Sequence, residues 1–182
     1  MGRRRMVLVY GTALGVLAAD QLTKWLVVEH LRGQEPVNVI GEFARFRYTT
    51  NTGGAFSLLT GFPLFFGLMA IVIMGLIVLY ARRVRSTGVL LVLGLLLGGA
   101  LGNFLDRALR GEEFLGGEVV DFVEVGTFPV FNVADSCITI GAITLAILLT
   151  REDLASRKAV AEEAEAGRRP LPLSDPDPDQ QR

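Results

Sequence analysis

The chain has 182 residues, of which 51% are hydrophobic, and its 18 basic and 19 acidic side chains leave a net charge of −1. Long uncharged runs alternate with short charged clusters, a pattern typical of membrane proteins rather than of globular domains. The single Cys137 excludes an internal disulfide, and the single His30 argues against a histidine-rich metal site or a Ser-His-Asp triad. No glycine pattern of the kind that binds nucleotides is present. We therefore expect no metal, no cofactor and no nucleic-acid partner.

The first predicted helix covers residues 6–28 and follows three arginines, Arg3 to Arg5. Read alone, this start also resembles a secretory signal ending at small residues. Three further hydrophobic runs downstream favour a retained helix, which is long enough to cross a bilayer. Asp20 and Lys24 lie four residues apart within it, so they share one helical face and can form an ion pair.

Residues 30–60 have a different character, because β-favouring and polar side chains alternate there. This pattern predicts short strands outside the hydrocarbon layer. Two more spanning helices follow, at residues 62–81 and 88–107, and the second contains several glycines at spacings that let helices pack closely. The same helix, at residues 88–107, carries Asn103, Asp106 and Arg107 on one face at its C-terminal end.

A fourth spanning helix is predicted at residues 129–150, which completes a membrane domain of residues 1–150. Residues 151–182 form a charged tail, which we expect to be helical at first and disordered at its Pro- and Asp-rich end. The basic clusters at 3–5, 82–85 and 151–158 fall on one side of this topology. By the positive-inside rule that side is the cytoplasm, so both termini are expected there.

Four aspartates then converge on the outer leaflet: Asp20 in the first helix, Asp106 at the end of the third, Asp121 in an outer loop and Asp135 at the start of the fourth. Acids at a membrane edge are a functional hypothesis by default. Two carboxylates within hydrogen-bond range share a proton, and the pair can then act as base and acid towards water and a carbonyl group. Asp121 and Asp135 are the preferred pair, because both lie in apolar surroundings beside the outer loop.

Structural explanations stand beside the chemical ones. Asp121 and Asp135 could each serve as a helix cap or a salt-bridge partner. Asp106 could form an ion pair at the helix end, and Asp20 and Lys24 could form a buried ion pair. Asn51, Asn103 and Asn132 offer amides that suit either peptide binding or capping and turns. Cys137 is interpreted as a small apolar filler and His30 as an interfacial surface residue.

Five segments of the chain carry a resemblance to a known family. They are Asp20-Gln21-Leu22-Thr23-Lys24, Asn51-Thr52-Gly53-Gly54-Ala55-Phe56, Gly98-Gly99-Ala100-Leu101-Gly102-Asn103-Phe104-Leu105-Asp106-Arg107, Val119-Val120-Asp121-Phe122 and Phe131-Asn132-Val133-Ala134-Asp135-Ser136. In this order, across about residues 6–150, they resemble the motifs of bacterial lipoprotein signal peptidase, or signal peptidase II.

The resemblance implies an intramembrane aspartic endopeptidase that cuts prolipoproteins just before a diacylglyceryl-modified lipobox cysteine. It implies a multi-pass protein of the bacterial inner membrane that acts as a monomer among membrane lipids, with its active site at the outer leaflet and a small β-cradle after the first helix. By motif, the catalytic residues are Asp121 and Asp135. The implied substrate-binding residues are Asn51, Asn103, Arg107 and Asn132, and the implied supporting residues are Asp20, Lys24 and Asp106.

Two features depart from the family pattern, a glycine- and acid-rich insert at residues 111–118 and the acidic tail, and neither touches a motif. Two other protein classes compete with the peptidase. A proton-coupled four-helix transporter would also use membrane acids, but it favours carboxylates near mid-membrane. A structural membrane subunit would use the same polar residues only to bind helices together.

Overall fold

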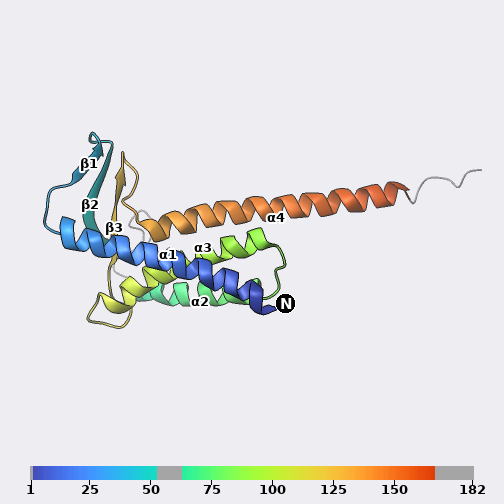
Figure 1. The fold of residues 1–182 in the computed structure, drawn as a ribbon, viewed down its shortest axis with the longest axis horizontal. Helices are drawn as coiled ribbons and strands as arrows, with labels where there is room; N and C mark the ends of the chain where they lie inside the picture. Colours follow the sequence, from blue (N-terminus) through green and yellow to red (C-terminus); the bar gives the residue numbers. More distant parts are fainter. Residues whose placement is uncertain (1, 53–62, 167–182) are drawn as a thin grey trace, which may run out of the picture. The chain divides into compact units, whose positions relative to one another are not determined.

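The structure is a computed structural model in which residues 2–52 and 63–166 are described. The elements in chain order are α1 (Gly2–Leu31), β1 (Val37–Ile40), β2 (Ala44–Asn51), α2 (Pro63–Ala81), α3 (Thr87–Leu109), β3 (Val119–Val125) and α4 (Val133–Ala166) (Figure 1). The chain divides into two compact units, Met1–Leu145 and Ala146–Arg182. The first unit holds the strands, three complete helices and the beginning of α4.

Within the described residues, four helices are long and apolar enough to cross a membrane, as predicted. α2 begins at Pro63, a residue suited to the first helical position because it lacks an N–H group. The Ser86 side chain accepts a hydrogen bond from the Val89 N–H and so caps the start of α3. α4 begins at Val133, four residues later than predicted, and continues to Ala166 without a break at residue 150.

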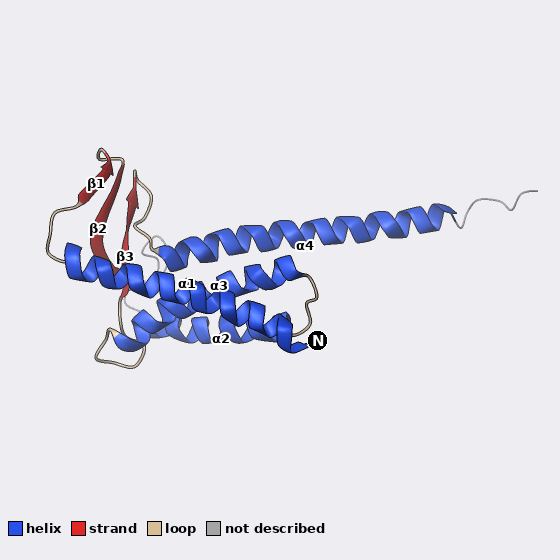
Figure 2. Ribbon diagram, in the orientation of Figure 1, coloured by secondary structure: helices blue, strands red, loops and turns tan. Residues whose placement is uncertain are grey.

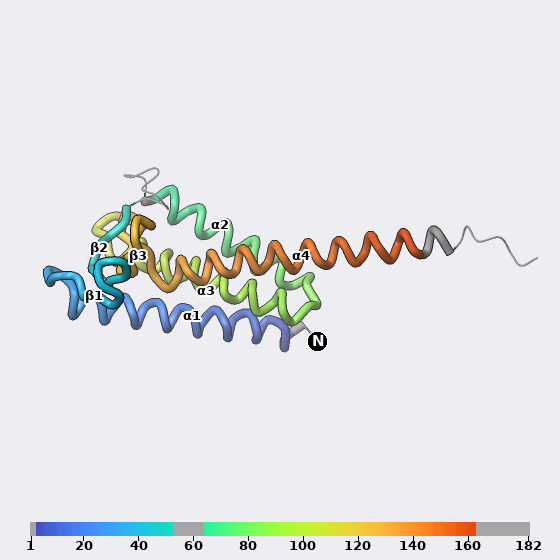
Figure 3. Tube along the Cα trace, turned by 90° about the horizontal axis from the view of Figure 1, so that it is seen from above, coloured from blue at the N-terminus to red at the C-terminus, as the bar shows by residue number. Residues whose placement is uncertain are grey.

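α3 is the central helix of the first unit. In its most apolar window 56% of the residues are buried, against 17% in α1 and 11% in α2. α3 packs against both of these helices (Figure 3). Gly98 allows the approach of α1, because a Cβ atom there would collide with the Ala13 carbonyl oxygen and the Val16 side chain. The outward apolar side chains of α1 and α2 remain exposed, which suits helices surrounded by lipid.

The three strands form one antiparallel sheet in the order β1-β2-β3 at one end of the helices (Figure 2). Val120 and Phe122 of β3 pack on Val27 of α1 and attach the sheet to that helix. Because side chains alternate along a strand, Asp121 faces the opposite side. The expected strands after the first helix are present, but Asp121 lies on a third strand rather than in a loop. Thr49 of β2 is its partner in the register.

The loop between α3 and β3, which contains the insert at 111–118, is tied to the helix before it. The Gly117 N–H donates to the Arg107 carbonyl oxygen over 3.0 Å. Leu115 is fully buried although its φ of 55° is one that leucine rarely adopts. Burial of this side chain holds the loop against the membrane helices.

The described part of the second unit continues α4 as a charged helix. Its side chains are exposed from residue 149 to residue 162. Arg157 pairs with Asp153, and Lys158 pairs with Glu162, both at a spacing of four residues. Such exposed pairs stabilise a helix only slightly. The predicted Pro- and Asp-rich tail lies outside the described residues.

Candidate active site

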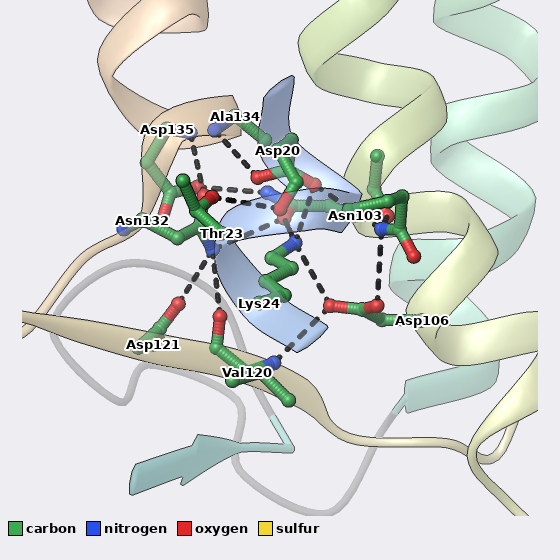
Figure 4. A network of polar contacts seen from close by, with 12 residues as sticks. Asp20, Thr23, Lys24, Asn103, Asp106, Val120, Asp121, Asn132, Ala134 and Asp135 are labelled. Atoms are coloured by element: carbon green, nitrogen blue, oxygen red, sulfur yellow. Dashed lines mark hydrogen bonds and ion pairs between the residues drawn. The ribbon is translucent and has the colours of Figure 1, made fainter. Parts of the chain in front are cut away.

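A cluster of polar side chains is buried where α1, α3, β3 and the first turn of α4 meet (Figure 4). Burying polar groups is unfavourable unless they are hydrogen-bonded or paired. The members that are at most 7% exposed are Asp20, Lys24, Asp106, Arg107, Asp121 and Asn132. Their contacts with one another join the four elements at this point.

Lys24 lies at the centre of this cluster and is 0% exposed. Its Nζ atom is 2.9 Å from Asp20 Oδ2 and 2.8 Å from Asp106 Oδ2. It also donates to Asn103 Oδ1 over 2.9 Å. An ammonium group has three N–H donors, and each has an acceptor here. The pairing of Asp20 with Lys24 that the sequence predicts is present, and it extends to α3.

The two carboxylates around Lys24 each accept a hydrogen bond from a backbone N–H group. Asp20 Oδ1 accepts from Ala134 over 2.9 Å, and Asp106 Oδ2 accepts from Val120 over 3.2 Å. Ala134 immediately precedes Asp135, and Val120 immediately precedes Asp121. Lys24 and its two partners therefore position both segments that carry the predicted catalytic aspartates.

Asn103 links the lysine to Asp135. Because Lys24 can only donate, the amide of Asn103 must turn its oxygen towards Nζ. Its Nδ2 group then points the other way and donates to Asp135 Oδ1 over 2.8 Å. The charge of Lys24 thus decides which end of this amide faces Asp135.

Asn132 and Asp135 form a reciprocal cap at the start of α4. The Asp135 N–H donates to Asn132 Oδ1 over 2.9 Å, and the Asn132 N–H donates to Asp135 Oδ2 over 3.3 Å. Two N–H groups that would otherwise lack partners at a helix start are satisfied in this way. The same geometry leaves Asn132 Nδ2 directed at Asp121 Oδ1, 2.6 Å away. Asn132 therefore bridges Asp121 and Asp135, which we call the aspartate pair.

Asp121 is 2% exposed and accepts a second amide hydrogen bond, from Asn51 of β2 over 3.3 Å. Burial, followed by the charge of Asp135, raises the pKa of Asp121 to about 7. The hydrogen bonds from Asn132 and Asn51 act in the opposite direction, because they favour the carboxylate. The pKa of Asp121 therefore lies close to neutral pH, where an acid-base group is most useful.

Arg107 brings a second cation towards the aspartate pair. Its side chain interacts electrostatically with both Asp121 and Asp135. It donates to the Asn103 carbonyl oxygen over 3.3 Å, and its guanidinium lies 5.5 Å from the centre of the Phe66 ring. These contacts place Arg107 between α2 and the polar cluster.

All nine predicted site residues lie in or beside this cluster, but two further contributors were missed. Gln21 donates from Nε2 to Asp20, to Asp106 and to the Gly102 carbonyl oxygen. Arg110 pairs with Asp106 over 2.9 Å. Gln21 belongs to the first quoted segment, and Arg110 follows Asp106 by four residues, so both positions carried a local signal. The pair of Arg110 with Asp106 lies within the end of α3, whereas the contacts of Gln21 with Gly102 and Asp106 depend on how α1 and α3 cross, which no local pattern shows.

The remaining residues that the sequence singles out lie elsewhere. Cys137 is partly buried on α4, and His30 is exposed and lies 2.9 Å from the Leu26 carbonyl oxygen. Residues 53–56 of the second motif lie outside the described residues. In the described part of the chain, no group of three or more His, Cys, Asp or Glu side chains is arranged to hold a metal ion. The place between Asp20 and Asp106 is taken by the Lys24 ammonium.

Comparisons with known proteins give one consistent result. A family model described as signal peptidase (SPase) II matches residues 12–151. The lipoprotein signal peptidase of Rhodococcus jostii is 46% identical over 145 residues, which are 80% of this chain and 73% of that protein. The lipoprotein signal peptidase of Geobacillus thermodenitrificans is 42% identical over 153 residues, which are 81% of this chain and 92% of that protein. A bacterial membrane enzyme solved by the in meso method at 2.3 Å matches with a TM-score of 0.70 and 32% identity, over 80% of this chain and 88% of that one.

Proposed function

Because the chain belongs to the signal peptidase II family, we propose that Asp121 and Asp135 are the catalytic residues with which it cleaves prolipoproteins. The family assigns the chain a peptidase activity in lipoprotein processing, and its relatives favour a peptidase over a transporter. The observation that supports these two residues is their joint contact with Asn132 in a buried site. The finer statements below rest on this proposal.

The chemistry proposed for the site needs only the aspartate pair and water. One carboxylate removes a proton from water, whose oxygen attacks the scissile carbonyl carbon, while the partner carboxyl protonates the carbonyl oxygen. When the resulting tetrahedral intermediate collapses, the leaving amine is protonated and the peptide bond breaks. Neither a thiol nor a metal ion takes part in these steps. Arg107 and the amides of Asn51, Asn103 and Asn132 are proposed to bind the peptide backbone near the aspartate pair.

The substrate class follows from the relatives' name and from where the site lies. Asp121 lies in the sheet, and Asp135 lies beside the C-terminal end of α3, where Asn103 contacts it. With the basic clusters in the cytoplasm, this end lies at the outer leaflet of the bacterial inner membrane. A diacylglyceryl-modified cysteine keeps its acyl chains in that leaflet, so the bond before the cysteine would reach the site. We propose such prolipoproteins as substrates and a monomer, surrounded by lipid, as the acting form.

A cleavage assay in detergent tests the proposal. A diacylated prolipoprotein and its unlipidated form are incubated with wild type, Asp121→Asn, Asp135→Asn and Cys137→Ala, and products are separated by gel shift. We expect cleavage of the lipidated form alone, abolished in both Asn variants and retained in Cys137→Ala. Turnover by either purified Asn variant would show that the aspartate pair is not catalytic.

The orientation is tested separately by labelling. Val39 on β1 is 57% exposed, so Val39→Cys in a Cys137→Ala background provides one accessible thiol. A membrane-impermeant maleimide added to intact spheroplasts should label it. Labelling only after lysis would place the sheet in the cytoplasm and overturn the proposed topology.

A further inference from the structure

The two members of the aspartate pair have unequal surroundings. Asp135 occupies the third position of α4, and Asp121 lies in the middle of a strand. The start of a helix carries a partial positive charge that favours an anion within its first turn, whereas a sheet has almost no net dipole. The backbone alone therefore favours a negative charge on Asp135 over one on Asp121.

The hydrogen bonds that the two carboxylates accept also favour the negative charge on Asp135 over one on Asp121. Asp135 accepts from a backbone N–H of its own cap and from the Asn103 amide, whose oxygen contacts the Lys24 ammonium. A cation on the amide oxygen polarises the amide and strengthens the bond that its N–H donates. Asp121 accepts from the amides of Asn132 and Asn51. The oxygen of the Asn132 amide accepts from the Asp135 backbone N–H, a neutral donor, where the oxygen of the Asn103 amide contacts an ammonium.

The charged groups that face the pair do not reverse this difference. Lys24 acts on both carboxylates, and so does Arg107 from α3. Asp20 acts on Asp135 in the opposite direction, but its carboxylate is paired with the Lys24 ammonium. Asp121 and Asp135 repel each other, so one of them holds a proton at neutral pH.

We propose that Asp135 is the ionised general base of the resting enzyme and that Asp121 holds the proton and is the general acid, with Lys24 and Asn103 as the positioning residues that set this order. This assignment rests on the proposed function. The pKa of Asp121, raised to about 7, agrees with it.

The assignment gives a balanced sequence of proton transfers. Asp135 takes a proton from water as the new C–O bond forms, and Asp121 gives its proton to the carbonyl oxygen. On collapse, the C–N bond breaks, Asp135 passes its proton to the leaving nitrogen, and Asp121 recovers a proton from the hydroxyl group that becomes the product carbonyl. One water is consumed, and both carboxyl groups return to their starting states.

Carboxyl NMR without substrate tests the assignment. The full chain is labelled with ¹³Cγ-aspartate, purified in detergent and titrated, and the two resonances are assigned by their loss in Asp121→Asn and Asp135→Asn. We expect the Asp121 resonance to titrate with a midpoint near 7, while the Asp135 resonance keeps the shift of an ionised carboxylate over that range. Asp153→Asn, which removes a 57% exposed carboxylate, is the matched control and should leave both resonances unchanged.

The opposite order, or equal titration of both resonances near neutral pH, would overturn the assignment. If Asp135→Asn does not fold, the loss of the titrating resonance in Asp121→Asn decides the question alone. Asn103→Ala provides the test of the positioning role, because removing its donor should raise the titration midpoint of Asp135 and lower that of Asp121. Unchanged midpoints in folded Asn103→Ala would contradict that role. If both Asn variants lose cleavage but the titration order is reversed, the proposed function stands and only the assignment of base to Asp135 and acid to Asp121 is refuted.

Discussion

Replacing Asp121 with asparagine should make the protein more stable at alkaline pH, even though it abolishes cleavage. In the wild type, a carboxyl group that is 2% exposed must ionise as the pH rises. Asparagine has nearly the same shape and stays neutral. Its amide oxygen can still accept the hydrogen bond that Asn132 donates at this position. The pH dependence of stability that Asp121 causes should therefore disappear.

The magnitude follows from the pKa of Asp121, which is raised from 3.8 to about 7. The folded state binds the proton more tightly than the unfolded chain does. The stabilisation by this proton is fully present below pH 3.8 and is lost as the pH rises through about 7. The whole shift corresponds to about 4 kcal/mol, of which about 2.5 kcal/mol falls between pH 5 and pH 8. For a chain of this size, that is a melting-temperature difference of roughly 5–10 °C.

Thermal unfolding in detergent at the two pH values measures this effect. The wild type should lose roughly 5–10 °C more than Asp121→Asn between pH 5 and pH 8. Asp153→Asn makes the same chemical change at a 57% exposed site and should follow the wild type. Equal losses in the wild type and Asp121→Asn would refute the claim that Asp121 is buried at an energetic cost.

Three other predictions test the surroundings of the aspartate pair. Gly102→Ala would place a methyl group against the Asp20 carboxylate, whereas the methyl group of Gly15→Ala would meet nothing within 4 Å. We expect the cleavage rate to fall on the order of a hundredfold in Gly102→Ala and to stay near wild type in Gly15→Ala. Equal rates in the two variants would contradict the packing around Gly102. Lys24→Met removes the cation that Asp20 and Asp106 share and leaves Asp106 only its pair with Arg110, so the free energy of unfolding should fall by about 3–5 kcal/mol, and an unchanged melting temperature would show that the lysine is dispensable. Finally, if Asp121 is the general acid, kcat/KM should decline above its pKa of about 7 by about tenfold per pH unit, and a profile that stays level far into the alkaline range would argue against this role.

Much of the fold could be predicted because it depends on local pattern. The four apolar runs are long, and Asp20 with Lys24 is a pair that one helical turn brings together. The cap at the start of α4 could also have been predicted, since Asn132 precedes Asp135 by the spacing of a capping box. Its presence explains why α4 begins at Val133 and not earlier.

The parts that were missed depend on contacts distant in sequence. Asp121 was placed in a loop because its strand is short and follows a glycine-rich insert. The partner that makes it a strand, β2, is separated from it by two membrane helices. Likewise, the contact of Lys24 with Asn103 and Asp106 depends on the close crossing of α1 and α3. A single sequence gives the glycines that permit this crossing but not its register.

The attachment to Lys24 of the segments that carry Asp121 and Asp135 has a consequence for biosynthesis. Once α3 has been inserted, Lys24 has its partners Asp20 and Asp106, so the first three helices can neutralise their buried charges without α4. Asp20 Oδ1 gains its backbone partner Ala134 only when the last helix arrives, and Asp135 arrives with it. An assembly intermediate of the first three helices would therefore have Lys24 paired but would lack Asp135. On the proposed mechanism, the capacity to cleave a peptide bond appears only when the last helix has joined the other three.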